Sequence, residues 1–296
     1  MIYTDPVYRP PFEARSLLLQ VTRGCSHNRC SFCTMYRNVP FAVESFVNIE
    51  ESLAEAREYV PNITRVFLEN GDPFVLEAER LLVIAERIHK YLPKVETIAM
   101  YASVKNIMNK TDAQLKALRQ AGINELNVGV ESGLDRTLSL MQKGYTADQA
   151  LRELTRLREA DMDYGANIIL GAAGSGHWEE NAAATAALLN QTTPYLIFTG
   201  TIHADPGCPL YGDIKNGQFA ENTIEEYLNE EDRLLELLQL DPCYYFGLHP
   251  SNIVPMHGFL PKDRERMREE IADFRQRHQA ILVERPVRGN EGAVLW

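Results

Sequence analysis

The sequence predicts an α/β fold in which strands and helices alternate along 296 residues. Three observations predict it: six short β-rich runs, helical patterns between them, and glycine-rich polar segments after several runs. The runs are mostly apolar, as parallel strands buried on both faces are. They lie at residues 17–22, 64–69, 97–102, 125–130, 164–170 and 195–204. This alternation predicts a parallel sheet, either open and doubly wound or part of a (β/α) barrel.

The segments between the runs show the three- and four-residue apolar spacing of amphipathic helices. Two such patterns are Ile49, Leu53, Ala56 and Val60, and then Leu81, Ile84, Ile88 and Tyr91. Capping boxes mark further helix starts and pair Thr111 with Gln114, Thr146 with Gln149, and Thr223 with Glu226. Residues 223–238 and 262–280 predict two late amphipathic helices. Residues 247–252 and 256–258 are expected to be loops that close the open side of the barrel.

Composition and charge are typical of a cytoplasmic enzyme. At 45% hydrophobic residues, the chain can form one large domain or one domain with an extension. The net charge of −11 disfavours a dedicated nucleic-acid binder, which usually carries a basic excess. No apolar run reaches the roughly 18 residues of a membrane span, and no charged-then-apolar leader is present. We therefore expect neither a membrane nor a nucleic acid as partner.

Three closely spaced cysteines follow the first predicted strand. Cys25, Cys30 and Cys33 form a C-x4-C-x2-C motif, whereas Cys208 and Cys243 are far downstream and isolated. Thiolates are soft ligands suited to iron–sulfur clusters or zinc, and a [4Fe–4S] cluster normally takes four of them. With three, one coordination position stays open for another ligand, as at catalytic metal sites.

Disulfides and zinc are the alternatives for these cysteines. An odd cysteine count in a chain long enough for a full core disfavours a disulfide framework. A structural zinc site would need a second C-x2-C or an H-x3-5-H pair, and none is present. His27 could be a fourth zinc ligand, but it lies inside the same loop, where tetrahedral closure would be cramped. An iron–sulfur cluster is the favoured interpretation.

Other strand ends carry glycines beside acidic or amide residues. These segments are residues 69–73, 129–133, 167–174 and 205–210. Glycine allows a ligand to approach the backbone, and the polar neighbours can bond amines and hydroxyls. One such segment is usually only a turn. Because the carboxyl ends of parallel strands meet at one edge, four of them beside a cysteine motif predict a cofactor site.

These motifs resemble the radical S-adenosylmethionine (SAM) enzymes over about residues 15–210. The longer first spacing of the cysteine motif resembles that of the Elongator-type branch. Residues 129–133 and 140–146 resemble methylthiotransferases and coproporphyrinogen dehydrogenases. The usual C-x3-C-x2-C motif is one residue shorter than the motif here. Residues 70–73 resemble the family's G-G-E/D-P segment, with Asn70 in place of the first glycine.

The resemblance implies a partial (β/α)6 TIM-type barrel with a mainly helical C-terminal extension. The core would span residues 1–210, and residues 211–296 would close or cover the barrel. One [4Fe–4S] cluster would be held by three ligands, Cys25, Cys30 and Cys33. SAM would bind the open iron through its amine and carboxylate.

The resemblance also assigns SAM contacts. Phe32 matches the aromatic residue before the third cysteine, and Gly71 with Asp72 matches the segment that holds the methionine amine. Glu131 and Asn167 match residues at the ribose. Further cofactor contacts would be Lys143 at the SAM carboxylate, Gly171 at the end of a turn against adenine, and Ser103 at the ribose or methionine.

Each of these residues also has a structural interpretation. Lys143 could be a solvated lysine on a helix surface, and Asn167 could cap a turn. Asp72, which precedes a proline, could simply form a turn. Glu131 is harder to explain structurally, because an acid at the end of an apolar strand needs a partner.

The implied reaction uses an external one-electron reductant such as flavodoxin or ferredoxin. Reductive cleavage of SAM would yield a 5′-deoxyadenosyl radical that abstracts hydrogen from a small-molecule substrate. Arg37, His203 and Cys208 are the candidates for substrate chemistry, each with a packing role as its alternative. The other functional hypotheses are a tRNA- or peptide-modifying radical SAM enzyme and a non-enzymatic zinc or iron–sulfur module. A second cysteine cluster, needed for an auxiliary centre, is absent.

Overall fold

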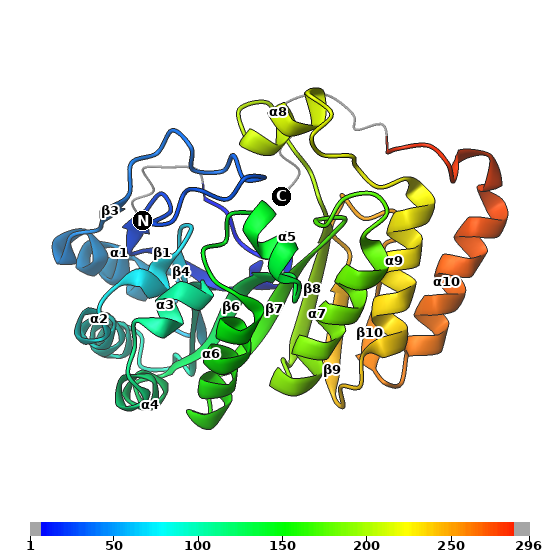
Figure 1. Cartoon of the computed structure of the whole chain (residues 1–296). Helices are drawn as coiled ribbons and strands as arrows, with labels where there is room; N and C mark the ends of the chain where they lie inside the picture. Colours follow the sequence, from blue (N-terminus) through cyan, green and yellow to red (C-terminus); the bar gives the residue numbers. More distant parts are fainter. Residues whose placement is uncertain (1–6, 287–296) are drawn as a thin grey trace.

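One sheet of eight strands organises residues 7–286, which the computed structural model describes (Figure 1). In spatial order the strands are β1 Leu17–Gln20, β4 Arg65–Glu69, β5 Thr97–Ala102, β6 Ile123–Glu131, β7 Asp163–Leu170, β8 Leu196–Thr201, β9 Cys243–Gly247 and β10 Met256–Leu260. A two-stranded ribbon of β2 Thr22–Arg23 and β3 Ala42–Val43 leads into and out of the cysteine loop.

The first seven strands of this order are parallel to their neighbours, and β10 pairs antiparallel with β9. The two ends of the order are β1 and β10, so the sheet forms an open barrel. All six predicted strands are present, and the expected partial (β/α) barrel is confirmed.

The helices lie outside the sheet, except for the short helix Pro209–Lys215, which lies above the strand ends (Figure 1). They are α1 Phe46–Tyr59, α2 Ala78–Tyr91, α3 Val104–Met108, α4 Asp112–Gln120, α5 Asp135–Leu140, α6 Ala147–Glu159, α7 Trp178–Thr192, α8 Pro209–Lys215, α9 Ile224–Leu237 and α10 Arg264–Arg277, with short 3-10 turns at η1 Pro11–Glu13, η2 Pro73–Val75 and η3 Gln279–Ile281. The main core lies between sheet and helices. Alternate strand residues such as Val66, Met100 and Val128 pack there against helical residues such as Leu81 and Leu154.

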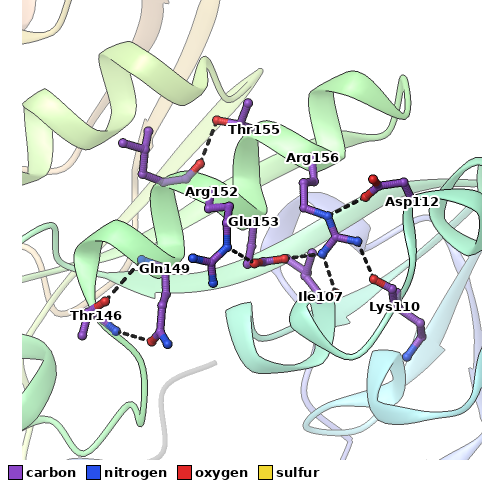
Figure 2. Close-up of polar contacts among 10 residues, drawn as sticks. Ile107, Lys110, Asp112, Thr146, Gln149, Arg152, Glu153, Thr155 and Arg156 are labelled. Atoms are coloured by element: carbon purple, nitrogen blue, oxygen red, sulfur yellow. Dashed lines mark hydrogen bonds and ion pairs between the residues drawn. The ribbon is translucent and has the colours of Figure 1, made fainter.

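Capping boxes fix where several helices begin, and ion pairs join neighbouring helices. The three predicted capping boxes are all formed. Figure 2 shows the one at Thr146, where α6 begins, and the contacts of Arg156 further along that helix. Arg156 Nε donates to Asp112 at 2.6 Å, and its other nitrogens donate to Glu153 and to the backbone oxygens of Ile107 and Lys110. This guanidinium ties α6 to the turn between α3 and α4.

A polar network closes the amino-terminal end of the barrel. Arg65 donates to Glu13 with Nε at 2.9 Å, and to Glu125 with Nη1 at 2.9 Å. Glu13 lies in η1 and is fully buried, so the segment before β1 forms the floor of the barrel. Above the floor, the rings of Phe67 and Tyr101 meet edge to face, with centroids 5.2 Å apart.

The extension confirms two predictions and corrects one. Helices α9 and α10 occupy the predicted amphipathic segments. The expectation that residues 256–258 form a loop is wrong, because they belong to β10 and continue the sheet. The sequence did not indicate this strand, because Gly258 lies at its centre and glycine is depleted in strands. Here a Cβ would lie 2.5 Å from Asp263 Cβ, so the close approach of α10 requires glycine.

Candidate functional site

A cavity of about 340 Å³ opens at the carboxyl ends of the strands. It brings together eleven of the fourteen residues nominated from the sequence. They are Cys25, Cys30, Phe32, Cys33, Gly71, Asp72, Ser103, Glu131, Lys143, Asn167 and His203. Arg37, Gly171 and Cys208 are not among its lining residues.

Hydrogen bonds to three backbone oxygens hold the cysteine loop in place. The carbonyl of Gly24 accepts from Gly71 N at 3.1 Å. Asn28 adopts a left-handed φ of 39° within the long first spacing, and its side chain donates to Tyr36 O at 2.8 Å. Ser31 donates through Oγ to Leu140 O at 2.9 Å. The extra residue of the motif therefore lies in a spacing that turns at Asn28, a residue type that tolerates this conformation.

Burial disfavours thiolates in this loop. It raises the pKa of Cys33 to about 12, with a further contribution from Cys30 and Cys25. The pKa values of Cys25 and Cys30 are also raised, mainly by burial. Bound iron would reverse this preference, because a coordinating thiol is deprotonated. Three soft donors on one cavity fit the donor set of a cluster with one open position.

His27, which lies in the cysteine loop, contacts the backbone of another segment. Its Nε2 lies 2.7 Å from the backbone oxygen of Gln142, and burial lowers its pKa. Within residues 7–286, no three His, Cys, Asp or Glu side chains are placed to hold a single metal ion.

The turn after β4 explains the departure from the G-G-E/D-P pattern. Asn70 has a φ of 83°, the conformation that favours glycine, and its side chain donates to Thr22 O at 2.8 Å. Asparagine is one of the few other residues that adopt it readily. At Gly71 a Cβ would lie 2.8 Å from Cys25 Cβ and 2.8 Å from the Tyr36 ring, so a side chain would collide with the cysteine loop.

Asp72, the next residue of this turn, is buried, and each of its carboxylate oxygens accepts a hydrogen bond. Ser26 Oγ donates to Oδ2 at 2.8 Å, and Asn106 Nδ2 donates to Oδ1. Burial raises the pKa of Asp72 to about 6, although both hydrogen bonds favour the carboxylate. Ser103 caps α3 and accepts from Asn106 N at 3.3 Å. Sequence reasoning missed Ser26 and Asn106, since nothing in their spacing indicates the contact with Asp72.

Glu131 and Lys143 form a buried ion pair at 2.8 Å. Glu131 follows a register shift at the end of β6 and has a φ of 63°, so its side chain turns back over Gly129. Burial lowers the pKa of Lys143, but the adjacent carboxylate outweighs this and raises it well above its usual value. A solvated surface position for Lys143 is therefore wrong. The partner that Glu131 needs is this lysine.

The three nominated residues outside the cavity have other contacts. Gly171 donates from its backbone to Glu230 Oε2 at 2.8 Å and packs under α9. Arg37 clamps the cysteine loop, with Nε donating to Cys33 O at 2.9 Å and Nη2 donating to Cys30 O at 2.6 Å. Cys208 is buried at the start of α8.

The extension contributes two cavity residues that sequence reasoning missed. His249 and Ser251 line the cavity from the segment between β9 and β10, which had been expected only to close the barrel. Ser251 Oγ accepts from Thr201 N at 2.9 Å and lies 2.6 Å from His249 Nδ1. Nearby, His203 Nε2 lies 2.7 Å from Asp205 Oδ1. His203 follows β8 and His249 follows β9, so these neighbouring strands each bring a histidine to the cavity, which His27 also lines.

Comparison with known proteins identifies the family. Residues 19–185 match the family described as the radical SAM superfamily. The chain belongs to the radical SAM superfamily. The sequence-based resemblance is confirmed, and the members of this superfamily are enzymes.

Curated radical SAM relatives match parts of the chain. "Radical S-adenosyl methionine domain-containing protein 1, mitochondrial" of Mus musculus is 28% identical over 137 residues, 44% of this chain and 30% of that protein. The tRNA-2-methylthio-N(6)-dimethylallyladenosine synthase of Methylococcus capsulatus is 25% identical over 218 residues, 69% of this chain and 46% of that protein. The matches thus span less than half the length of these relatives.

Solved radical SAM structures show the same fold at low sequence identity. The methyltransferase TsrM from Kitasatospora setae has a TM-score of 0.56 at 17% identity, covering 68% of this chain and 39% of that one. Elp3 from Methanocaldococcus infernus has a TM-score of 0.51 at 12% identity, covering 88% and 63%. Within residues 7–286, none of the helices has the length and apolarity needed to cross a bilayer.

Proposed function

We propose that this radical SAM protein binds one [4Fe–4S] cluster through Cys25, Cys30 and Cys33, and SAM in the adjoining cavity. The observation that carries this is the convergence of the three thiols with Asp72, the Glu131–Lys143 pair and Asn167 on one cavity. When bound, cluster and SAM would supply the one-electron reductive cleavage of SAM that makes hydrogen abstraction from a substrate possible.

The residues of the chain would orient SAM and exclude water. The turn at Gly71 packs closely against the cysteine loop, and Asp72 next to it offers the methionine amine a carboxylate held in place by Ser26 and Asn106. Lys143 would exchange part of its pairing with Glu131 for the SAM carboxylate. The other contacts to SAM would come from Phe32, Ser103 and Asn167. Gly171 does not line the cavity and would only support the turn that lies against adenine.

We propose a small molecule as the substrate. The net charge of −11 disfavours an RNA substrate, because nucleic-acid binders usually carry a basic excess. His203 and His249 are the substrate-side candidates, because they line the cavity on the side of β8 and β9. Arg37 would then act by supporting the loop, and Cys208 by packing at the start of α8. An RNA substrate is the second candidate, since one relative is named as a tRNA-modifying synthase.

The division of the chain and its location are also proposals. Residues 1–210 would be the catalytic core, and residues 211–296 an extension that covers the barrel. A cytoplasmic location is proposed, and cell fractionation tests it directly against the mitochondrial location in the name of one relative.

Anaerobic reconstitution tests the proposed function. We expect about four irons per chain, as in one [4Fe–4S] cluster, and 5′-deoxyadenosine when dithionite and SAM are added. Cys25→Ala should abolish that product, whereas Cys243→Ala, far from the loop in β9, should retain it. A colourless zinc protein, or unchanged product from Cys25→Ala, would refute the proposal.

A further inference from the structure

The turn that follows β7 is held by the C-terminal extension. Gly171 donates from its backbone to Glu230 Oε2 at 2.8 Å, and Gly176 donates from its backbone to Glu226 Oε1 at 2.7 Å. Glu226 and Glu230 are about one turn apart on α9, which runs alongside α7 (Figure 1). The extension therefore supplies hydrogen-bond acceptors at both ends of residues 171–176.

The contact at Gly171 is also a close packing contact. A Cβ at this position would lie 2.1 Å from the ring of Tyr227, and Gly171 has a φ of 78°, a conformation that favours glycine. Tyr227 and Glu230 are three residues apart, so they lie on the same face of α9, and both are buried. One face of α9 therefore fixes the backbone of Gly171 by packing and by a hydrogen bond.

Glu230 also connects this turn to the end of β6. Its Oε1 accepts from Asn181 Nδ2 at 2.7 Å, and Asn181 Oδ1 accepts from Ser132 Oγ at 2.6 Å. Glu230, Asn181 and Ser132 are each at most 1% exposed. Ser132 directly follows Glu131 in the chain. A series of buried hydrogen bonds therefore runs from α9 through α7 to the residue next to the Glu131–Lys143 pair.

Glu231, the next residue of α9, provides a comparison. It is also buried, but its Oε1 accepts from Tyr245 Oη at 2.7 Å, in β9 of the extension itself. Glu230 instead accepts from Gly171 and Asn181, which lie on two different segments before the extension. An apolar side chain of similar volume would avoid the cost of burying a carboxyl group, but it could not join these segments.

We propose that Glu230 is a positioning residue for SAM, which fixes the ends of β6 and β7 relative to each other. The inference rests on the proposed function, because Glu131 and Asn167, two of the proposed SAM contacts, lie at these strand ends. Glu230 acts through the backbone of Gly171 and through Asn181, and neither glutamate nor asparagine lines the cavity. In this arrangement the extension helps to form the SAM site and is more than a cover over the barrel.

The test compares Glu230→Leu with Glu231→Leu, because the two glutamates are buried next to each other on one helix. Calorimetry on the cluster-loaded protein without reductant should show that E230L raises the Kd of SAM about tenfold, whereas E231L leaves it within about twofold. Amide hydrogen exchange in the ligand-free protein should become faster at Gly171 in E230L only, because this amide loses its acceptor. With dithionite, the KM for SAM should rise in E230L while kcat for 5′-deoxyadenosine formation stays within about twofold.

Ser132→Ala tests the other end of the network, and it decides the question where E230L does not fold. It removes the hydroxyl that donates to Asn181 and leaves the extension unchanged, so the Kd of SAM should rise about threefold. Circular dichroism and iron content check that every variant is folded and loaded.

A Kd of SAM that is the same in E230L or S132A as in wild type would overturn the inference. Equal increases in E230L and E231L would also overturn it, because they would indicate a general loss of stability. The same holds for a fall in kcat without a change in KM, since a positioning residue for SAM acts on its binding. Absence of SAM binding by the cluster-loaded wild type would instead refute the proposed function, and the inference with it.

Discussion

Asn70 shows how a single residue can depart from a family pattern and keep its geometry. The backbone at this position has a φ of 83°, and asparagine meets the requirement while donating to Thr22. Gly71, the next residue, cannot be replaced so easily, because the cysteine loop occupies the space of a side chain. The two positions therefore meet different constraints. Asn70 must adopt a positive φ, and Gly71 must leave space for the cysteine loop.

We expect Gly71→Ala to disturb the cysteine loop. The added methyl would overlap Cys25 and Tyr36, so the free energy of unfolding should fall by about 1–3 kcal/mol and bound iron should decrease. Urea unfolding and iron analysis measure both effects. The control is Gly212→Ala in α8, where no atom lies within 4 Å of the added carbon. Equal iron content in the two variants would contradict the prediction.

The Glu131–Lys143 pair is expected to stabilise the ligand-free protein. Glu131→Gln leaves a buried lysine without its counter-charge, which should cost about 3–5 kcal/mol of unfolding free energy. Arg277→Gln removes an exposed pair with Asp273 and should cost at most about 1 kcal/mol. Chemical denaturation of both variants provides the comparison, and similar losses would show that Lys143 has another buried partner.

At the scale of elements, the helices are set by local signals and then tied together by contacts distant in sequence. The capping boxes of α4, α6 and α9 are readable from single tetrapeptides. Arg156 could not be distinguished in the sequence from Arg152, which lies one turn earlier on α6. In the structure Arg152 is largely exposed, whereas Arg156 joins two helices (Figure 2).

Arg156→Leu should therefore destabilise the protein more than Arg152→Leu. The first variant leaves the buried Glu153 and two backbone oxygens with fewer donors, and should cost about 1–3 kcal/mol. The second removes a mostly exposed contact and should cost less than about 1 kcal/mol. Thermal and urea unfolding of the pair test this, and the opposite ranking would contradict the assignment.

Element prediction failed at β10 for a physical reason. A strand with a central glycine and a following proline reads as a loop, because both residues are depleted in strands. The strand exists because β9 offers a free edge and α10 covers the glycine. His249 and Ser251 lie in the β9–β10 connection, where a loop was predicted, and only the structure shows that this loop reaches the cavity.

At the scale of the whole molecule, several glutamates are buried within residues 7–286. Burial raises the pKa of Glu69, Glu230 and Glu231 to about 7 each. A folded-state pKa above the unfolded value means that the native state binds more protons between those two values. Proton binding by these glutamates therefore adds to the free energy of unfolding. The added free energy is complete below the pKa of the unfolded state and is lost as pH rises through the pKa of the folded state.

The ligand-free protein is therefore expected to lose stability from about pH 5 to about pH 8. Glu231→Gln keeps an acceptor for Tyr245 Oη and cannot ionise, so it should reduce that loss by about 1–3 kcal/mol. Denaturant midpoints at several pH values measure this. Glu225→Gln, at an exposed position on the same helix, should leave the pH dependence as in wild type. A steeper decline in Glu231→Gln would reverse the sign and refute the argument.

The sequence by itself determined the alternating α/β order, the six core strands, the starts of the capped helices and eleven of the residues that line the cavity. These follow from local signals: apolar runs, capping residues, and motifs placed at strand ends that must meet at one edge. Tertiary structure alone decided which polar side chains pair across that edge. Asp72 meets Ser26 and Asn106, Glu131 meets Lys143, and Gly171 turns away to Glu230. Such pairings depend on how side chains from distant parts of the chain point toward one another in the folded protein. Local sequence patterns cannot predict this.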